Sequence, residues 1–106
     1  MTDAVENFQN EGLVVIKFSA VWCGPCKRLE PTISKLESEF SDAKVVRVDV
    51  DDNPEIAQKY KVRSLPTLLF LKDGEEVNRV IGLSLIEPLR KIFRDLLRPQ
   101  ENQIIS

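Results

Sequence analysis

Two cysteines, Cys23 and Cys26, are the residues of this sequence best suited to chemistry. Gly24 and Pro25 separate them, and the apolar run Leu13 to Phe18 lies shortly before them. Cysteines at i and i+3 in the first turn of a helix lie on one face, close enough to alternate between dithiol and disulfide. Unpaired N–H groups and the positive end of the helix dipole favour a thiolate at a helix start, which predicts Cys23 as the nucleophile.

Composition narrows the alternatives for this pair. The absence of histidine excludes Cys-His hydrolysis within one chain, and two cysteines supply only half of the ligands that a structural zinc site usually takes. A dimer sharing four thiolates around zinc stays open, as does a role for the cysteines as small buried apolar residues. We expect no metal site and no cofactor other than the Cys23–Cys26 disulfide. The acidic run Asp49, Asp51 and Asp52 is interpreted as a solvated loop rather than a cation site.

Length and charge limit the number of domains, the kinds of partner and the location to be expected. The 106 residues predict one domain, compact over about residues 3–98 with a mobile tail at 99–106, that buries a core without a disulfide staple. A net charge of -2 with both signs dispersed favours neither nucleic acid nor a membrane surface as partner. No apolar stretch approaches the ~20 residues that span a bilayer, and no secretory signal is recognised. We therefore expect a cytoplasmic monomer, in which a lone disulfide is more often catalytic than structural.

Hydrophobic periodicity predicts the elements that position the cysteines. A short helix at residues 3–9 precedes the strand Leu13 to Ser19, which is apolar apart from Lys17 and suits the centre of a sheet covered on both faces. A helix from Cys23 to about Phe40, kinked at Pro31, follows that strand. Its apolar stripe consists of Leu29, Ile33, Leu36 and Phe40.

The second half of the chain continues this pattern. Lys44 to Val50 is a predicted strand, followed by a short helix with Asn53 as N-cap and Pro54 at its first position, ending near Tyr60. A helix between strands favours a parallel crossover. Thr67 to Leu71 and Val77 to Ile81 then form a predicted antiparallel hairpin.

A last helix closes the predicted fold. Ser84 and Glu87 have the spacing of a capping box, with Ser84 as the N-cap. The apolar stripe that this helix would bury consists of Leu85, Leu89, Ile92, Phe93 and Leu96.

Several motifs in a fixed order resemble the thioredoxin family. They are Trp22-Cys23-Gly24-Pro25-Cys26-Lys27, Pro31, the segment Asp49 to Pro54, Ser64-Leu65-Pro66-Thr67, Asp73-Gly74 and Ile81-Gly82, within roughly residues 13–97. The resemblance implies a thioredoxin-like α/β fold, with a central mixed β-sheet flanked by helices on both faces. Family members usually carry a further short strand ahead of the first helix, for which the residues before Leu13 leave little room. We expect four strands, with five as the alternative.

The resemblance also implies an activity. The protein would be a thiol-disulfide oxidoreductase and general protein disulfide reductase, in which Cys23 attacks a target disulfide and Cys26 resolves the mixed disulfide. Gly24-Pro25 favours a reductant, because oxidising and isomerising relatives carry histidine in this dipeptide. The implied partners are thioredoxin reductase or an equivalent electron donor and target proteins with disulfides. A more oxidising exchange protein or isomerase, and an accessory subunit that binds another protein without redox turnover, are the alternatives.

A substrate-binding patch follows from the same resemblance. The Leu65–Pro66 peptide bond would be cis and lie against the dithiol, leaving the backbone of the preceding residue free to pair with an extended substrate. Apolar residues would surround Cys23 in a docking patch made of Trp22, Val50, Leu65, Ile81, Gly82 and Leu83. Ordinary strand packing is the alternative for Val50 and Ile81.

Lys17 departs from the family pattern. Most thioredoxins have a buried aspartate here that is thought to exchange protons with the resolving cysteine, and Arg47 occupies the place of its usual basic partner. A buried ammonium must reach solvent, pair with a carboxylate or lose its proton. One interpretation is a snorkelling Lys17 with a carboxylate partner, which leaves Arg47 facing a like charge. The other is a protonated Lys17 that lowers the pKa of Cys26 and makes the disulfide a slightly stronger oxidant.

Overall fold

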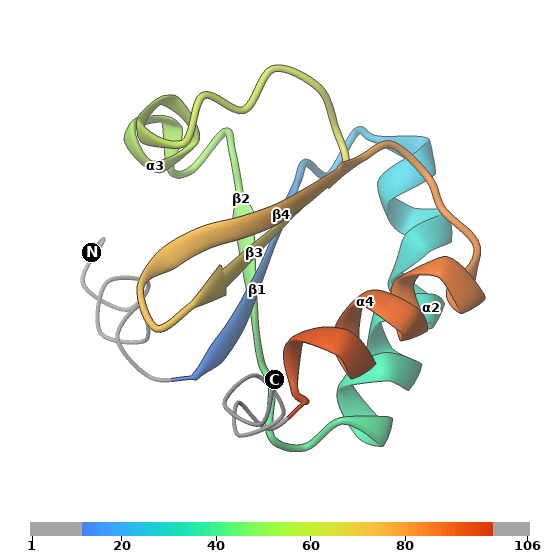
Figure 1. The fold of residues 1–106 in the computed structure, drawn as a ribbon. Helices are drawn as coiled ribbons and strands as arrows, with labels where there is room; N and C mark the ends of the chain where they lie inside the picture. Colours follow the sequence, from blue (N-terminus) through green and yellow to red (C-terminus); the bar gives the residue numbers. More distant parts are fainter. Residues whose placement is uncertain (1–11, 99–106) are drawn as a thin grey trace.

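Strand β1 (Leu13–Ser19) is the central element of the fold, and its residues Leu13 to Phe18 are buried. In the computed structural model, which describes residues 12–98, β1 pairs in parallel with β2 (Lys44–Asp49) and antiparallel with β3 (Thr67–Lys72). Strand β4 (Glu75–Ile81) pairs with β3 and completes the order β2-β1-β3-β4 (Figure 1). The prediction of a mixed four-stranded sheet is therefore confirmed for the described residues.

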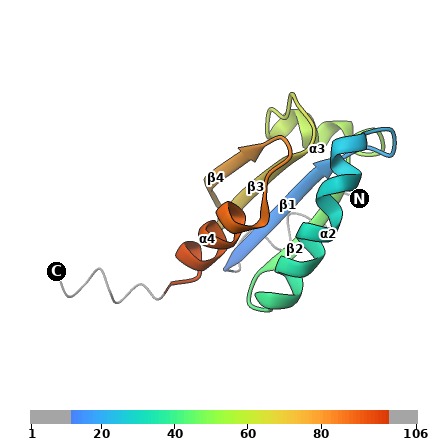
Figure 2. The same cartoon turned by 90° about the vertical axis from the view of Figure 1, so that its right-hand side faces the viewer.

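Helices cover both faces of this sheet, as predicted. Helices α2 (Gly24–Glu39) and α4 (Ile86–Leu96) lie together on one side, and α3 (Pro54–Lys59) lies on the other (Figures 1 and 2). Successive side chains of β1 point to opposite faces of the sheet. Leu13 and Val15 pack on the side of α2 and α4, whereas Val14 and Ile16 pack on the side of α3. Lys17, two residues after Val15, therefore points toward α2.

Aromatic packing joins α4 to the rest of its layer. Phe93 is fully buried, and its ring lies 5.7 Å from that of Phe70 in an edge-on arrangement and 5.4 Å from that of Phe40 in a stacked one. The predicted stripes of both long helices provide these contacts: Leu29, Ile33, Leu36 and Leu89 are buried, and Phe40, Ile92 and Leu96 pack against them while half-buried.

The start of α4 differs from the prediction. Ser84 is not its N-cap, because the Ser84 hydroxyl donates to the carbonyl of Leu85 while Glu87 pairs with Arg90. Leu85 is the N-cap residue, in an extended conformation, and it is 80% exposed. Leu85 therefore lies outside the buried stripe, which begins with the half-buried Ile86.

The connection through α3 also corrects three expectations. Asn53 precedes the helix and Pro54 opens it as predicted, but the Asn53 side chain caps nothing and donates to the carbonyl of Asp49 instead. Strand β2 ends at Asp49, although the N–H of Val50 still donates to Ser19. The chain then returns as β3, which is antiparallel to β1, so among the strands of residues 12–98 only the α2 connection joins a parallel pair.

Two sequence expectations lie outside the described residues, namely the helix at residues 3–9 and the tail at 99–106. Within the described part, no helix combines the length and apolar character needed to cross a membrane.

The aromatic contacts predict that α4 contributes strongly to stability. Phe93→Ala removes a fully buried ring from between Phe40 and Phe70 and should lower the free energy of unfolding by about 3–5 kcal/mol. Urea unfolding followed by circular dichroism measures this loss. Val77→Ala, at a 45% exposed position on edge strand β4, is the control, and we expect a change within about 0.5 kcal/mol. A loss for Phe93→Ala no larger than that of the control would contradict the packing described.

Candidate active site

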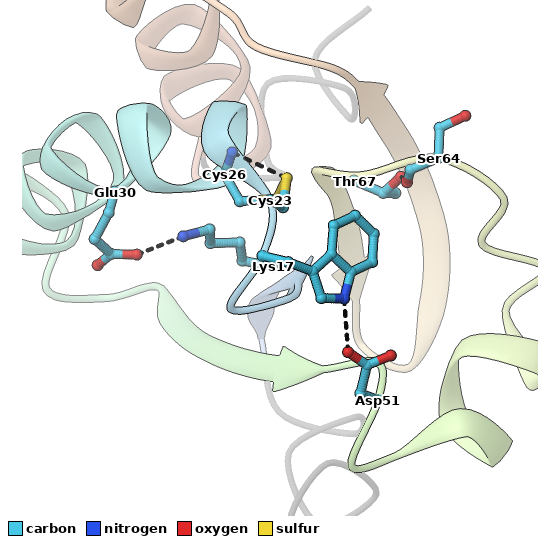
Figure 3. Close-up of a disulfide and its surroundings, with 8 residues drawn as sticks. Lys17, Cys23, Cys26, Glu30, Asp51, Ser64 and Thr67 are labelled. Carbon is cyan, nitrogen blue, oxygen red and sulfur yellow. Dashed lines mark hydrogen bonds and ion pairs between the residues drawn. A yellow bond between two sulfur atoms is a disulfide. The ribbon is translucent and has the colours of Figure 1, made fainter.

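The cysteine pair lies where β1 gives way to α2. Cys23 is the N-cap residue of α2, and its Sγ accepts the backbone N–H of Cys26 at 3.2 Å (Figure 3). The two residues form a disulfide with a Cα–Cα distance of 5.3 Å, and both are buried. The predicted placement of the pair at a helix start is therefore confirmed. Because the Cys23 sulfur faces an N–H of the first helical turn, the same geometry favours a thiolate at Cys23 when the bond is reduced.

A groove of about 480 Å³ opens beside Cys23. Its lining comprises Trp22, Cys23, Gly24, Pro25, Val50, Ala57, Val62, Arg63 and Leu65. Trp22 is 67% exposed, and its indole N–H donates to Asp51 at 2.8 Å, which fixes the ring at the edge of the groove. Three of the six predicted patch residues, Trp22, Val50 and Leu65, thus lie together next to the dithiol.

Sequence reasoning missed the part of the groove that comes from α3 and the segment after it. Ala57, Val62 and Arg63 line this wall, and the first two pack against the core on the α3 side of the sheet. Their apolar character marks Ala57 and Val62 as packing residues, but no local pattern indicates which surface they border. Only the docking of α3 against the sheet brings them to Cys23.

The other three patch residues lie beyond a cis peptide bond. The Leu65–Pro66 bond is cis, as the resemblance implied, and the Gly82 N–H donates to the Pro66 carbonyl at 2.8 Å. Gly82 has a φ of 94°, a conformation that glycine adopts at little cost. Ile81 and Leu83, on either side of it, are 62% and 49% exposed. These residues do not line the groove itself; Gly82 is bonded to Pro66, which follows the groove residue Leu65 in the chain.

Lys17 is buried and paired with a carboxylate. Its Nζ donates to Glu30 Oε1 at 2.6 Å, and the side chain is only 6% exposed (Figure 3). The other Glu30 oxygen accepts from Arg47 Nε at 2.9 Å and Nη2 at 2.6 Å. The expected carboxylate partner thus exists, but the ammonium does not snorkel to solvent. Glu30 also lies between the two cations, so Arg47 does not face an unbalanced like charge.

These hydrogen bonds set the ionisation of Glu30. Burial alone raises the pKa of its carboxyl, but the hydrogen bonds and positive charges of Arg47 and Lys17 outweigh burial and lower the pKa from 4.5 to about 2. Glu30 is therefore a fixed anion at neutral pH. Its position one helical turn after Cys26 connects the charge cluster to the dithiol.

The fold and the cysteine pair together define the class of this protein, which is a thiol-disulfide oxidoreductase. Comparison with known proteins gives the family. The model of the family described as Thioredoxin matches residues 2–95 of this chain. The thioredoxin of Chlamydia caviae is 49% identical over 83 residues, covering 76% of this chain and 81% of the relative. That of Bacillus subtilis is 48% identical over 84 residues, covering 78% and 81%.

Solved structures agree with the sequence relatives. The crystal structure of thioredoxin from Trypanosoma brucei brucei matches with a TM-score of 0.83 and 37% identity, covering 93% of this chain and 88% of that chain. The chain belongs to the thioredoxin family and is a protein disulfide reductase.

The low pKa of Glu30 predicts a pH-dependent contribution to stability. A carboxyl whose pKa falls from 4.5 to about 2 on folding stabilises the folded state above pH 4.5, and this contribution is lost as the pH falls toward about 2. Glu30→Gln should therefore lower the free energy of unfolding by about 1 kcal/mol at pH 7, since neutral hydrogen bonds replace charged ones. The deficit should shrink between about pH 4.5 and pH 2.

Denaturant unfolding at several pH values measures this difference. Glu75→Gln, at an exposed position at the start of β4, is the matched control. Its difference from the wild type in free energy of unfolding should not shrink over this pH range. A deficit that stays constant down to pH 2 would mean that the ion pairs of Glu30 do not contribute in this way.

Proposed function

We propose that this protein is a general protein disulfide reductase of the cytoplasm, with Cys23 as the nucleophile and Cys26 as the resolving thiol. The observation that carries this proposal is that the two cysteines line different cavities. Cys23 lines the groove, whereas Cys26 lines a separate cavity on the Lys17 side. A target segment seated in the groove therefore meets Cys23 first.

The proposed reaction is two successive thiol-disulfide exchanges. The Cys23 thiolate attacks one sulfur of the target disulfide, the other target sulfur leaves as a thiolate, and a mixed disulfide remains. The Cys26 thiolate then attacks Cys23, the bond between Cys23 and the target breaks, and the second target sulfur leaves. Two electrons pass to the target, and the Cys23–Cys26 disulfide reforms.

The residues around the pair support this cycle in distinct ways. Gly24 lines the groove beside Cys23, and Pro25 restrains the first turn of α2, which must accommodate both redox forms. The exposed Trp22 ring, with Val50 and Leu65, offers apolar contact to a target segment. Beside them, Pro66, Ile81, Gly82 and Leu83 extend the docking surface, with Pro66 next to the backbone that would pair with an extended substrate.

The partners and location complete the proposal. Thioredoxin reductase or an equivalent donor would return two electrons to the disulfide, and proteins with accessible disulfides would be the targets; the chain itself would act as a monomer without a cofactor. A cytoplasmic location suits a catalytic dithiol, since a reducing compartment keeps it available. A binding subunit without redox turnover would need no second cysteine, so the pair favours the reductase.

Single cysteine variants test the assigned roles. Cys23→Ser should abolish the catalysis of insulin reduction by dithiothreitol, because no thiolate remains at the groove. Cys26→Ser should instead accumulate mixed disulfides, since the exchange stops halfway. Insulin precipitation measures the first effect, and mass spectrometry of trapped complexes measures the second. Wild-type activity in Cys23→Ser would refute the proposed function.

A further inference from the structure

Cys26, the proposed resolving cysteine, lines a cavity that is separate from the groove and that four charged residues border. This cavity, of about 340 Å³, is formed by residues of β1, α2, the end of β2 and the segment before α2. Its lining comprises Lys17, Ser19, Ala20, Val21, Cys26, Lys27, Glu30 and Asp49. Cys26 is only 2% exposed, so this cavity is the surrounding that its thiol meets when the disulfide opens.

Four charged groups line the cavity, and their exposure to solvent differs. The Lys17 side chain is 6% exposed, whereas that of Glu30 is 37% exposed. Lys27 is exposed, and the half-buried Asp49 carboxylate already accepts two backbone N–H groups, from Asp51 and Asp52. Solvent screens an exposed charge much more than a buried one. Of the four, the Lys17 ammonium is therefore the charge that solvent screens least, although the formal charges of the four groups cancel.

The resolving step needs such a charge. A buried thiol resists ionisation because burial disfavours the charged form. Only the thiolate attacks a disulfide, so the rate of resolution depends on the thiolate fraction of Cys26. A nearby positive charge favours the thiolate and offsets the cost of burial.

We propose that Lys17 is a positioning residue of the resolving step, whose buried ammonium stabilises the Cys26 thiolate, and that Glu30 holds the ammonium in place while opposing its field. The Cys26 proton passes to solvent through the cavity. The thiolate then forms the bond to Cys23 Sγ as the bond between Cys23 and the target breaks, and the electron pair leaves with the target sulfur. This role rests on the proposed assignment of Cys23 and Cys26.

Opposite effects of the two charges follow from this arrangement. Lys17→Met removes the cation and should slow resolution at pH 7 by about threefold for each unit by which the thiol pKa rises, because the lower thiolate fraction is partly offset by a more nucleophilic thiolate. Glu30→Gln removes the opposing anion and should accelerate resolution. A purely structural ion pair would behave differently, because breaking it from either side would disturb Cys26 in the same direction.

The test uses the reduced full-length protein and 5,5′-dithiobis(2-nitrobenzoate) in stopped-flow absorbance between pH 5 and pH 10. Thionitrobenzoate is released in two phases, first by attack of Cys23 and then by attack of Cys26 on the mixed disulfide. We expect the pH midpoint of the second phase to rise in Lys17→Met and to fall in Glu30→Gln. Lys17→Arg should restore the wild-type midpoint, and Lys35→Met, at an exposed site of α2 away from the cavity, should leave it unchanged.

A failure of the role of Lys17 and a failure of the proposed function would give different results in this experiment. A second-phase midpoint that stays in place in Lys17→Met, or that moves in the same direction in both variants, overturns the role of Lys17. The double variant Lys17→Met with Glu30→Gln replaces the buried pair by neutral side chains, a change that proteins often tolerate, and its midpoint should lie between those of the single variants. A first phase that persists in Cys23→Ser would instead refute the assignment of the nucleophile.

Discussion

Every part of the site depends on strand β1 being fixed at the centre of the sheet. It is bonded to β2 along one edge and to β3 along the other, and its side chains from Leu13 to Phe18 are buried on both faces. A shift of one residue would exchange the two faces, which would move Lys17 away from Glu30 and into the apolar layer on the α3 side, so the register is strongly specified. The end of β1 therefore fixes where α2 begins, which places Cys23, and the alternation of β1 directs Lys17 toward α2.

Features that depend on local chemistry could be predicted from the sequence. The bounds of β1 follow from its apolar run between Gly12 and Ala20, and the cysteine spacing is a property of one helical turn. The turn of the β3–β4 hairpin consists of Asp73 and Gly74, which have φ angles of 51° and 91°, as residue types that tolerate positive φ should. In each of these segments the neighbours in the chain decide the structure.

Features that depend on contacts between distant segments could not be predicted in the same way. The sequence offers many carboxylates to Lys17, and the choice of Glu30 depends on the phase of α2 against β1. The same holds for Val62 and Arg63 in the groove wall. Leu85 fits an apolar stripe by spacing, but the Ser84 hydroxyl bonds to the next carbonyl rather than capping the helix, and the helix starts one residue too late to bury Leu85.

The position of Trp22 gives the protein an intrinsic optical reporter. The sequence contains a single tryptophan, and this indole is held by Asp51 at the groove that Cys23 lines. Its emission therefore arises from one environment, a few atoms from the sulfur that changes oxidation state. A target that covers the ring would replace water around it with apolar groups. Reduction of the Cys23–Cys26 disulfide would remove a neighbouring group that quenches indole fluorescence. Binding and electron transfer can thus both be followed by fluorescence, without attaching a label.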